Sequence, residues 1–312
     1  MPKSKVIKKI VWAVDAFHKP DLLRKHAVED LRNLVKGTGA KAVEPVYVLS
    51  PDQLNLALEF SSPWIEHHAT AVKRALAHLV KGIDVPHLMT PKVLVQNIPS
   101  ITQSAKVLAV YARRSGADLI VVSTHATEGF AGWLLTSFAE TLLLHSKVPV
   151  MVVGPRSRSI RKYDHILFPS DLGIHSKASF QRVMALAKSL GAELTLFHTI
   201  RHPIAPVILS GAYLLGGGWL SVPSYLSAEE DRRGKFGESL AKIARKAGIK
   251  TNVVIDVANV GVVNSILTYA KRRKISLIAM AAHSGPVSSE LIGSITWQVV
   301  RNTPSPVWVM RG

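Results

Sequence analysis

Two histidines stand at the ends of apolar runs, where their side chains could take part in chemistry. His125 follows the run 118–124 (DLIVVST), and His283 follows the run 276–282 (SLIAMAA). The carboxyl end of a parallel strand faces the crevice in which open α/β sheets bind ligands, so each histidine could donate to a phosphate or transfer a proton. Neither belongs to a serine–histidine–aspartate or metal-ligand spacing. The pattern therefore favours ligand contact over catalysis.

Two aspartates end a second pair of apolar runs. Asp15 closes IVWAVD and Asp171 closes ILFPSD. A carboxylate at this point can accept hydrogen bonds from two hydroxyls of a ligand. It can equally cap the following helix or close an Asx turn. The residue types alone leave both interpretations open.

These residues are parts of an internal repeat. Asp15 and Asp171 are 156 residues apart, and His125 and His283 are 158 residues apart. The segments 148–153 (VPVMVV) and 305–310 (SPVWVM) match at an offset of 157 residues. A period of about half of a 312-residue chain indicates two domains of one fold.

Short apolar runs alternate with longer stretches of helical periodicity, which indicates strand–helix units and a parallel sheet. We expect an α/β fold of two Rossmann-like domains, 1–155 and 165–312, joined by a basic, exposed linker at 156–164. Each domain should hold a five-stranded parallel sheet flanked by helices. The expected strands are 10–15, 43–50, 92–96, 119–123 and 148–153, then 165–170, 193–199, 252–257, 276–282 and 306–310. The helical stripes in the first half are Leu23, Ala27, Leu31, Leu34 and Val35; Ile65, Ala69, Val72, Leu76 and Leu79; and Ile101, Ala105, Leu108 and Ala112.

The composition is that of a globular protein, with 47% hydrophobic and 19% charged residues. The chain has no cysteine, which excludes disulfides, thiolate metal sites and cysteine nucleophiles. The formal net charge is +18, which favours anionic partners without choosing among them.

The order of these motifs resembles the universal stress proteins, in their tandem form with two domains in one chain. That family has a first strand ending in Val-Asp, a fourth strand leading into a Gly-Thr-His-Gly type of motif, a Gly-Ser pair that opens a helix, and a last strand with Pro-Val. The first half has AVD at 13–15, STHA at 123–126, TS at 136–137 and PV at 149–150. The second half has PSD at 169–171, AAHS at 281–284, GS at 293–294 and PV at 306–307.

The resemblance implies a phosphate-cradling loop, which in the nucleotide-binding members carries three spaced glycines and then Ser or Thr. Glycine lets backbone N–H groups at a helix start approach phosphate oxygens closely. In the first half the glycine positions hold Ser123, Ala126 and Thr136, followed by Ser137. In the second half they hold Ala281, Ser284 and Gly293, followed by Ser294, and the last spacing is one residue shorter. Both loops therefore depart from the family pattern.

The resemblance also assigns roles to single residues. Asp15 and Asp171 occupy the positions at which the family has an acidic residue near the ribose hydroxyls. Val48, in the expected strand 43–50, and the histidines His125 and His283 join them as expected cofactor contacts.

The function implied is that of a cytoplasmic stress-response protein that binds a small anionic ligand, with ATP or another adenine nucleotide as the leading candidate, and acts through protein partners. No metal is expected beyond a divalent cation that accompanies the nucleotide. The sequence has no P-loop lysine and no evident catalytic base, so we expect at most slow ATP hydrolysis. The alternative is a nucleotide-independent interaction protein or a protein that binds an apolar ligand.

Three further expectations concern surfaces. The segment 203–226, rich in glycine, proline and aromatic residues, either packs on the other domain or a second chain, or forms a lid over an apolar, lipid-like ligand. The basic clusters are interpreted first as solvated faces, and a weak, salt-sensitive association with membranes or nucleic acid is the secondary hypothesis. As the family pairs its domains through their last strands, 148–153 should meet 305–310 in an internal pseudo-dimer, and two chains could pair further as a homodimer.

Overall fold

The structure is a computed structural model of the 312-residue chain. It describes ten stretches of the chain. They are residues 7–14, 22–51, 62–123, 137–154, 156–158, 160–173, 176–201, 222–258, 261–282 and 293–311.

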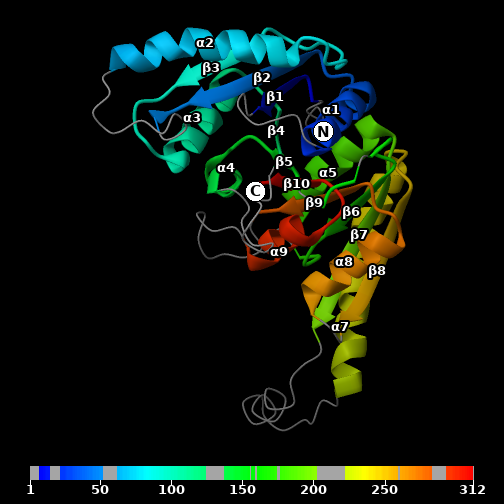
Figure 1. Cartoon of the computed structure of the whole chain (residues 1–312). Helices are drawn as coiled ribbons and strands as arrows, with labels where there is room; N and C mark the ends of the chain where they lie inside the picture. Colours follow the sequence, from blue (N-terminus) through cyan, green and yellow to red (C-terminus); the bar gives the residue numbers. More distant parts are fainter. Residues whose placement is uncertain are drawn as a thin grey trace.

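Ten strands of the described residues form one continuous sheet (Figure 1). The first half contributes β1 (Lys9–Ala13), β2 (Ala42–Leu49), β3 (Lys92–Val95), β4 (Leu119–Ser123) and β5 (Val150–Val153). The second half contributes β6 (His165–Pro169), β7 (Glu193–Arg201), β8 (Thr251–Ala258), β9 (Leu277–Ala281) and β10 (Val307–Met310). All ten strands were expected from the sequence.

The strand order is β3-β2-β1-β4-β5-β10-β9-β6-β7-β8. Neighbouring strands within each half are parallel, and only the central pair, β5 with β10, is antiparallel among the pairs described. Each half is therefore a five-stranded parallel unit, as expected, and the two units join into a single mixed sheet.

Helices cover both faces of this sheet. One face carries α1 (Leu22–Thr38), α2 (Ser62–Val80), α5 (Ser176–Leu190) and α7 (Val222–Lys246). The other face carries α3 (Ile101–Arg114), α4 (Ser137–His145), α8 (Val262–Arg272) and α9 (Ser294–Asn302). Each face has its own apolar core, because successive strand residues point to opposite sides.

Strand β1 illustrates why the strands read as continuous apolar runs. Ile10 and Trp12 are buried in the core beneath α1, whereas Val11 is buried in the core beneath α3. A parallel strand covered on both faces has no solvent side, so polar residues have no place in its middle. The same reason explains why these runs could be recognised in the sequence.

The antiparallel pair β5–β10 connects the two halves. Val307 lies opposite Val152, Trp308 opposite Met151, and Val309 opposite Val150. This confirms the expectation that the last strands of the two halves meet. The pairing covers what would otherwise be an open apolar edge on each five-stranded unit.

Contacts between helices and loops reinforce the connection. Helix α1 of the first half packs against α5 of the second so closely that a Cβ on Gly37 would lie 2.6 Å from Leu190 Cδ2. The Arg301 guanidinium of α9 forms an ion pair with Glu140 of α4, with Nη2 2.9 Å from Oε1. Arg311, just after β10, donates to the main-chain carbonyl of Leu144 in α4.

Two details differ from the expectations. Ile101 was expected to point inward, but it is 46% exposed because it opens α3 beyond the end of the edge strand β3. The four basic side chains of the linker are exposed as expected: Arg156, Arg158, Arg161 and Lys162. The linker itself is nevertheless anchored, because Ser157 and Tyr163 are buried and Asn33 of α1 donates to the carbonyl of Ile160.

A buried acid lies where this linker meets α1. Asp30 is fully buried, and its carboxyl lies close to the Tyr163 hydroxyl, although no hydrogen bond of normal geometry joins them. Burial raises the pKa of Asp30 to about 8, since desolvation disfavours the carboxylate; the Tyr163 hydroxyl opposes this shift, and the charge of Glu29 adds to it. Asp30 is therefore protonated in the folded protein at neutral pH.

This pKa predicts how stability depends on pH. The folded protein retains a proton that the unfolded chain releases above pH 3.8, so the contribution of Asp30 is fully present below that value and is lost as the pH rises to about 8. Asp30→Asn removes this loss, and we expect the free energy of unfolding at pH 7 to rise by about 2 to 4 kcal/mol. Urea denaturation of both proteins from pH 5 to pH 9 measures the difference. Equal pH slopes for the two proteins would contradict the assignment.

Candidate functional site

Each half of the sheet has one point at which the chain reverses its direction of strand addition. In the first half this point lies between β1 and β4, and in the second half between β6 and β9. Loops that leave the carboxyl ends of two such strands diverge to opposite faces, and the crevice between them is where open α/β sheets bind ligands. Among the expected site residues that the structure describes, Ser123 and Asp171 lie at or just beyond the carboxyl ends of β4 and β6, and Gly293 and Ser294 lie at the start of α9.

The structure describes six of the twelve expected site residues. Those that lie outside the described residues are Asp15, His125, Ala126, Thr136, His283 and Ser284. The expected lid, 203–226, lies outside them up to residue 221, and its last residues belong to α7. The expected ligand contacts of all twelve residues remain predictions.

In the first half, the structure describes Val48, Ser123 and the backbone of Ser137. Val48 is buried in β2 and packs in the core beneath α3, so its side chain has no access to a ligand and only its main chain could take part. Ser123 is half-buried at the carboxyl end of β4, opposite Val153 of β5. Ser137 is the first residue of α4, as the phosphate-loop pattern requires.

In the second half, Asp171 lies just beyond the carboxyl end of β6 and is exposed. Its Oδ1 accepts a hydrogen bond from the Gly173 N–H at 3.3 Å, which is the contact of an Asx turn. Among the described residues Oδ2 accepts no hydrogen bond, so the turn itself uses only one of the two carboxylate oxygens. The two interpretations of Asp171 are thus compatible.

On the neighbouring strand, β9 leads to the start of α9. The Gly293 N–H donates to the Ala282 carbonyl at 3.1 Å, which fixes the helix start beside the strand end. Ser294 is exposed as the first residue of α9, and Gly293 supplies no side-chain cap to the helix. A Cβ added to Gly293 would meet no atom of the described residues within 4 Å.

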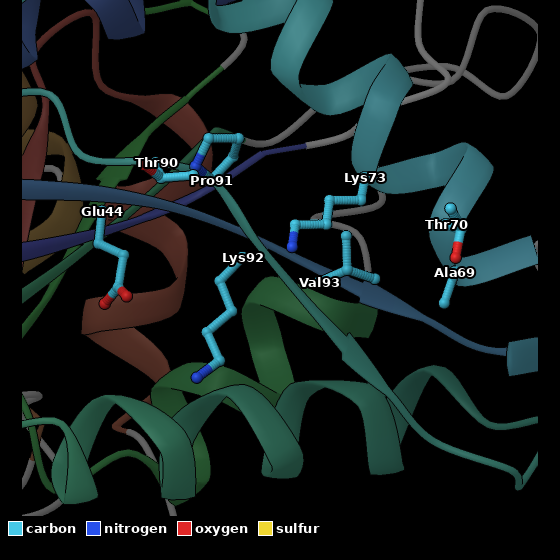
Figure 2. Close-up of a pocket in the computed structure, with 8 residues that line it drawn as sticks. All are labelled: Glu44, Ala69, Thr70, Lys73, Thr90, Pro91, Lys92 and Val93. Carbon is cyan, nitrogen blue, oxygen red and sulfur yellow. The ribbon is translucent and has the colours of Figure 1, made fainter.

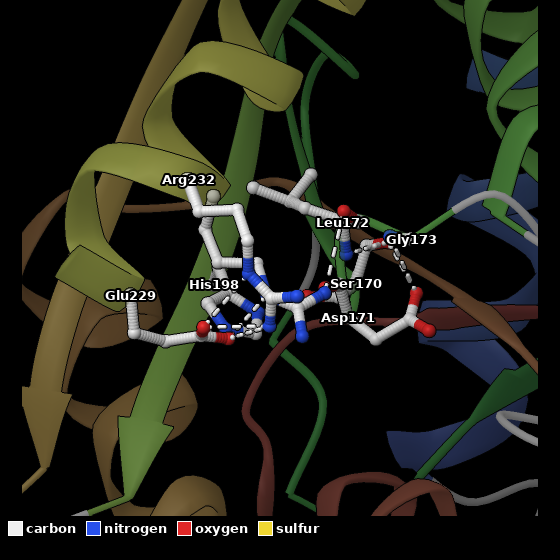
Figure 3. Close-up of polar contacts among 8 residues, drawn as sticks. Ser170, Asp171, Leu172, Gly173, His198, Glu229 and Arg232 are labelled. Carbon is white, nitrogen blue, oxygen red and sulfur yellow. Dashed lines mark hydrogen bonds and ion pairs between the residues drawn. The ribbon is translucent and has the colours of Figure 1, made fainter. Parts of the chain in front are cut away.

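Three residues that were not among the expected site residues hold the Asp171 turn, and two of them, His198 and Glu229, are labelled in Figure 3. His198 of β7 donates from Nδ1 to the Ser170 carbonyl at 2.8 Å. Arg233 of α7 donates to the Asp171 carbonyl at 2.5 Å, and Glu229 accepts from Arg233 Nε at 2.6 Å. For Glu229 and Arg233 the only signal in the sequence was the charged run EEDRRGK, which is also typical of an exposed helix, and His198 had no signal beyond its place in an expected strand.

The protonation of these groups follows from their surroundings. Burial lowers the pKa of His198 below 6.5, and its hydrogen bond to Ser170 opposes this shift, so the imidazole is neutral at pH 7. Burial opposes the ionisation of Glu229, but its bonds to Arg233 and Arg232 outweigh this and lower the pKa of the carboxyl. The turn is therefore held by one neutral donor and one ion pair.

A separate groove of about 430 Å³ lies near the amino ends of β2 and β3 (Figure 2). Its lining includes Lys73 of α2 and Lys92 at the start of β3. Glu44, near the start of β2, is held there by Lys9 at 2.7 Å and by the Tyr111 hydroxyl at 2.7 Å. The first-half crevice lies at the opposite, carboxyl ends of these parallel strands, and the strands β1, β4, β5 and β10 lie between the groove and the β6–β9 crevice, so the groove is not part of the candidate site.

No group of three or more His, Asp or Glu side chains in the described residues is arranged to hold a metal ion. None of the helices built from them is long and apolar enough to cross a membrane.

Comparison with known proteins agrees with the architecture. A model of the universal stress protein family matches residues 7–154 and again residues 162–311. The crystal structure of a universal stress protein from Archaeoglobus fulgidus DSM 4304 is similar, with 17% identity, a TM-score of 0.62, and coverage of 97% of this chain and 96% of that one. A functionally unknown protein from Pseudomonas aeruginosa PAO1 is similar at 14% identity, with a TM-score of 0.62 and coverage of 98% and 92%. No curated protein sequence matched the chain.

At these identities the solved structures establish the fold alone, whereas the family model covers nearly the whole chain, once in each half. The chain therefore belongs to the universal stress protein family and carries two of its domains in tandem.

Proposed function

We propose that this protein binds an adenine nucleotide, ATP or ADP, in the crevice of its second half, and that it acts in a stress response through ligand-dependent contacts with other proteins. The observation that carries the proposal is that an acidic side chain and a helix start lie at the carboxyl ends of the paired strands β6 and β9. Asp171 lies exposed beyond β6, and Gly293 and Ser294 open α9 beyond β9, which pairs with β6.

The two sides of this crevice offer complementary chemistry. The start of α9 presents backbone N–H groups, a positive dipole end and the Ser294 hydroxyl, which together suit phosphate oxygens. The second carboxylate oxygen of Asp171 suits a donor, such as a ribose hydroxyl. A nucleotide has both kinds of group, whereas inorganic phosphate has only the first.

The proposal includes no efficient catalysis. Asp171 is exposed and tied to its own turn, and His198 has its Nδ1 bonded to the main chain of that turn. These bonds favour a ligand contact for Asp171 and a structural role in the turn for His198 over the activation of water. An accompanying divalent cation would be bound by the nucleotide phosphates.

Ligand retained through purification gives the first test. The protein is denatured in a volatile buffer, and the released small molecules are identified by mass spectrometry and quantified by ultraviolet absorbance. We expect ATP or ADP at up to one molecule per chain. A lipid in its place would favour the alternative of an apolar ligand. If no small molecule is released and millimolar ATP does not bind in a titration, the nucleotide proposal is wrong.

Two substitutions measure separately how much each side of the crevice contributes to the affinity for ATP. Asp171→Asn should weaken ATP binding by roughly 10- to 100-fold, because a charged acceptor of hydroxyl bonds is lost, and should leave tripolyphosphate binding unchanged. Ser294→Ala should weaken both ligands by roughly 3- to 10-fold, because it removes a phosphate donor. Isothermal titration calorimetry measures these affinities.

Asp164→Asn is the matched control, since Asp164 is an exposed aspartate at the amino end of the same strand β6. It makes the same change of charge away from the crevice. An equal loss of ATP affinity in this control would mean that overall charge, and not the crevice, determines binding.

A further inference from the structure

One side of helix α7 contacts the turn that carries Asp171 (Figure 3). Glu229, Arg233 and Gly237 are spaced by four residues, so they share one face of the helix. That face contacts the turn at residues 171 and 172. The hydrogen bonds of this contact join residues that are 61 and 62 positions apart in the chain.

Arg233 makes the polar part of this contact. Its Nη1 donates to the Asp171 carbonyl at 2.5 Å and, more weakly, to the Leu172 carbonyl at 3.4 Å. Its Nε donates to Glu229 Oε1 at 2.6 Å. The planar guanidinium allows both sets of bonds at once, which a lysine ammonium on a flexible stem does not reproduce.

Gly237 makes the apolar part possible. A Cβ at this position would lie 3.1 Å from Leu172 Cδ1 and 2.7 Å from Val253 Cγ1. The absence of a side chain therefore lets α7 approach the turn closely enough for Arg233 to reach its carbonyls. The Leu172 side chain is only 1% exposed at this contact.

The turn needs such support because its backbone is in an unfavourable conformation. Leu172 has a φ of +47°, in the left-handed region that residues with a Cβ rarely adopt. The Leu172 N–H is held by Ser170 Oγ at 3.0 Å, and the Ser170 carbonyl is held by His198. Three successive carbonyls, at residues 170–172, thus accept bonds from side chains of β7 and α7.

We infer that Arg233 is a positioning residue for ligand binding: it fixes the turn that presents the Asp171 carboxylate to the crevice. This inference rests on the proposed function. Arg233 acts on the main chain of Asp171, and Asp171 acts on the ligand. The loss of Arg233 should therefore affect only the part of the ligand that Asp171 recognises.

The test compares two ligands with one another. Arg233→Gln should weaken the binding of ATP by roughly 10-fold, and it should change the binding of 2′,3′-dideoxy-ATP, which lacks both ribose hydroxyls, by less than about twofold. The ratio of the two affinities should fall toward one. Arg233→Lys, which keeps the charge but not the planar fork, should fall between the wild type and Arg233→Gln.

Arg232→Gln is the matched control. Arg232 is the adjacent arginine of α7, its side chain is 68% exposed, and it bonds to Glu229 without a described bond to the turn. We expect it to leave both affinities unchanged. In the ligand-free protein, hydrogen exchange of the amides at residues 172 and 173 should be faster in Arg233→Gln and unchanged in Arg232→Gln.

The outcomes distinguish this inference from the proposal beneath it. If the wild type binds no ATP, the proposed function fails and the positioning role fails with it. If the wild type binds ATP but Arg233→Gln keeps the wild-type ratio of affinities, only the positioning role is wrong. An equal loss of both ligands in Arg233→Gln would likewise overturn it, because a general loss of structure does not discriminate between them.

Discussion

The antiparallel pairing of β5 with β10 is the constraint on which the rest of the molecule depends. Each of these strands is the last of its half and is buried along its whole length. Without the other, each would be an apolar edge strand with unpaired N–H and C=O groups. Pairing removes both edges at once and makes ten strands continuous, so the two domains have a shared sheet and not merely a linker between them.

The same pairing determines where the candidate crevices lie. Strand β4 neighbours β5, and β9 neighbours β10, so the loops that lead to α4 and α9 leave the sheet on either side of the joint. The ion pair between Glu140 of α4 and Arg301 of α9 connects the two helices directly. Glu140 lies in the first turn of α4, where a negative charge opposes phosphate binding, and the Arg301 guanidinium offsets that charge.

Much of this architecture could be predicted from the sequence, because it depends on local pattern and repetition. Strands buried on both faces read as apolar runs, the repeated Pro-Val motif marked the last strand of each half, and the family resemblance implied that these two strands pair. The anchoring of the linker could not be read in this way, since Tyr163 is buried against Asp30, a residue more than a hundred positions earlier.

The candidate site was predictable only in part for a similar reason. Asp171, Gly293 and Ser294 follow strands, and position relative to a strand is visible in the sequence. Arg233 and His198 reach the turn from other elements and bond to its main-chain carbonyls, which carry no residue-specific signal. A charged helix segment such as EEDRRGK looks the same whether one of its arginines faces water or a strained turn.

A crystal structure of the protein grown with ATP would test the central claim most directly. The account predicts a nucleotide in the crevice between β6 and β9, with its ribose at the Asp171 carboxylate, its phosphates at the start of α9, and the turn at 170–173 still bonded to Arg233. A nucleotide bound in the groove between Lys73 and Lys92, or a crevice that stays empty at saturating ATP, would contradict it.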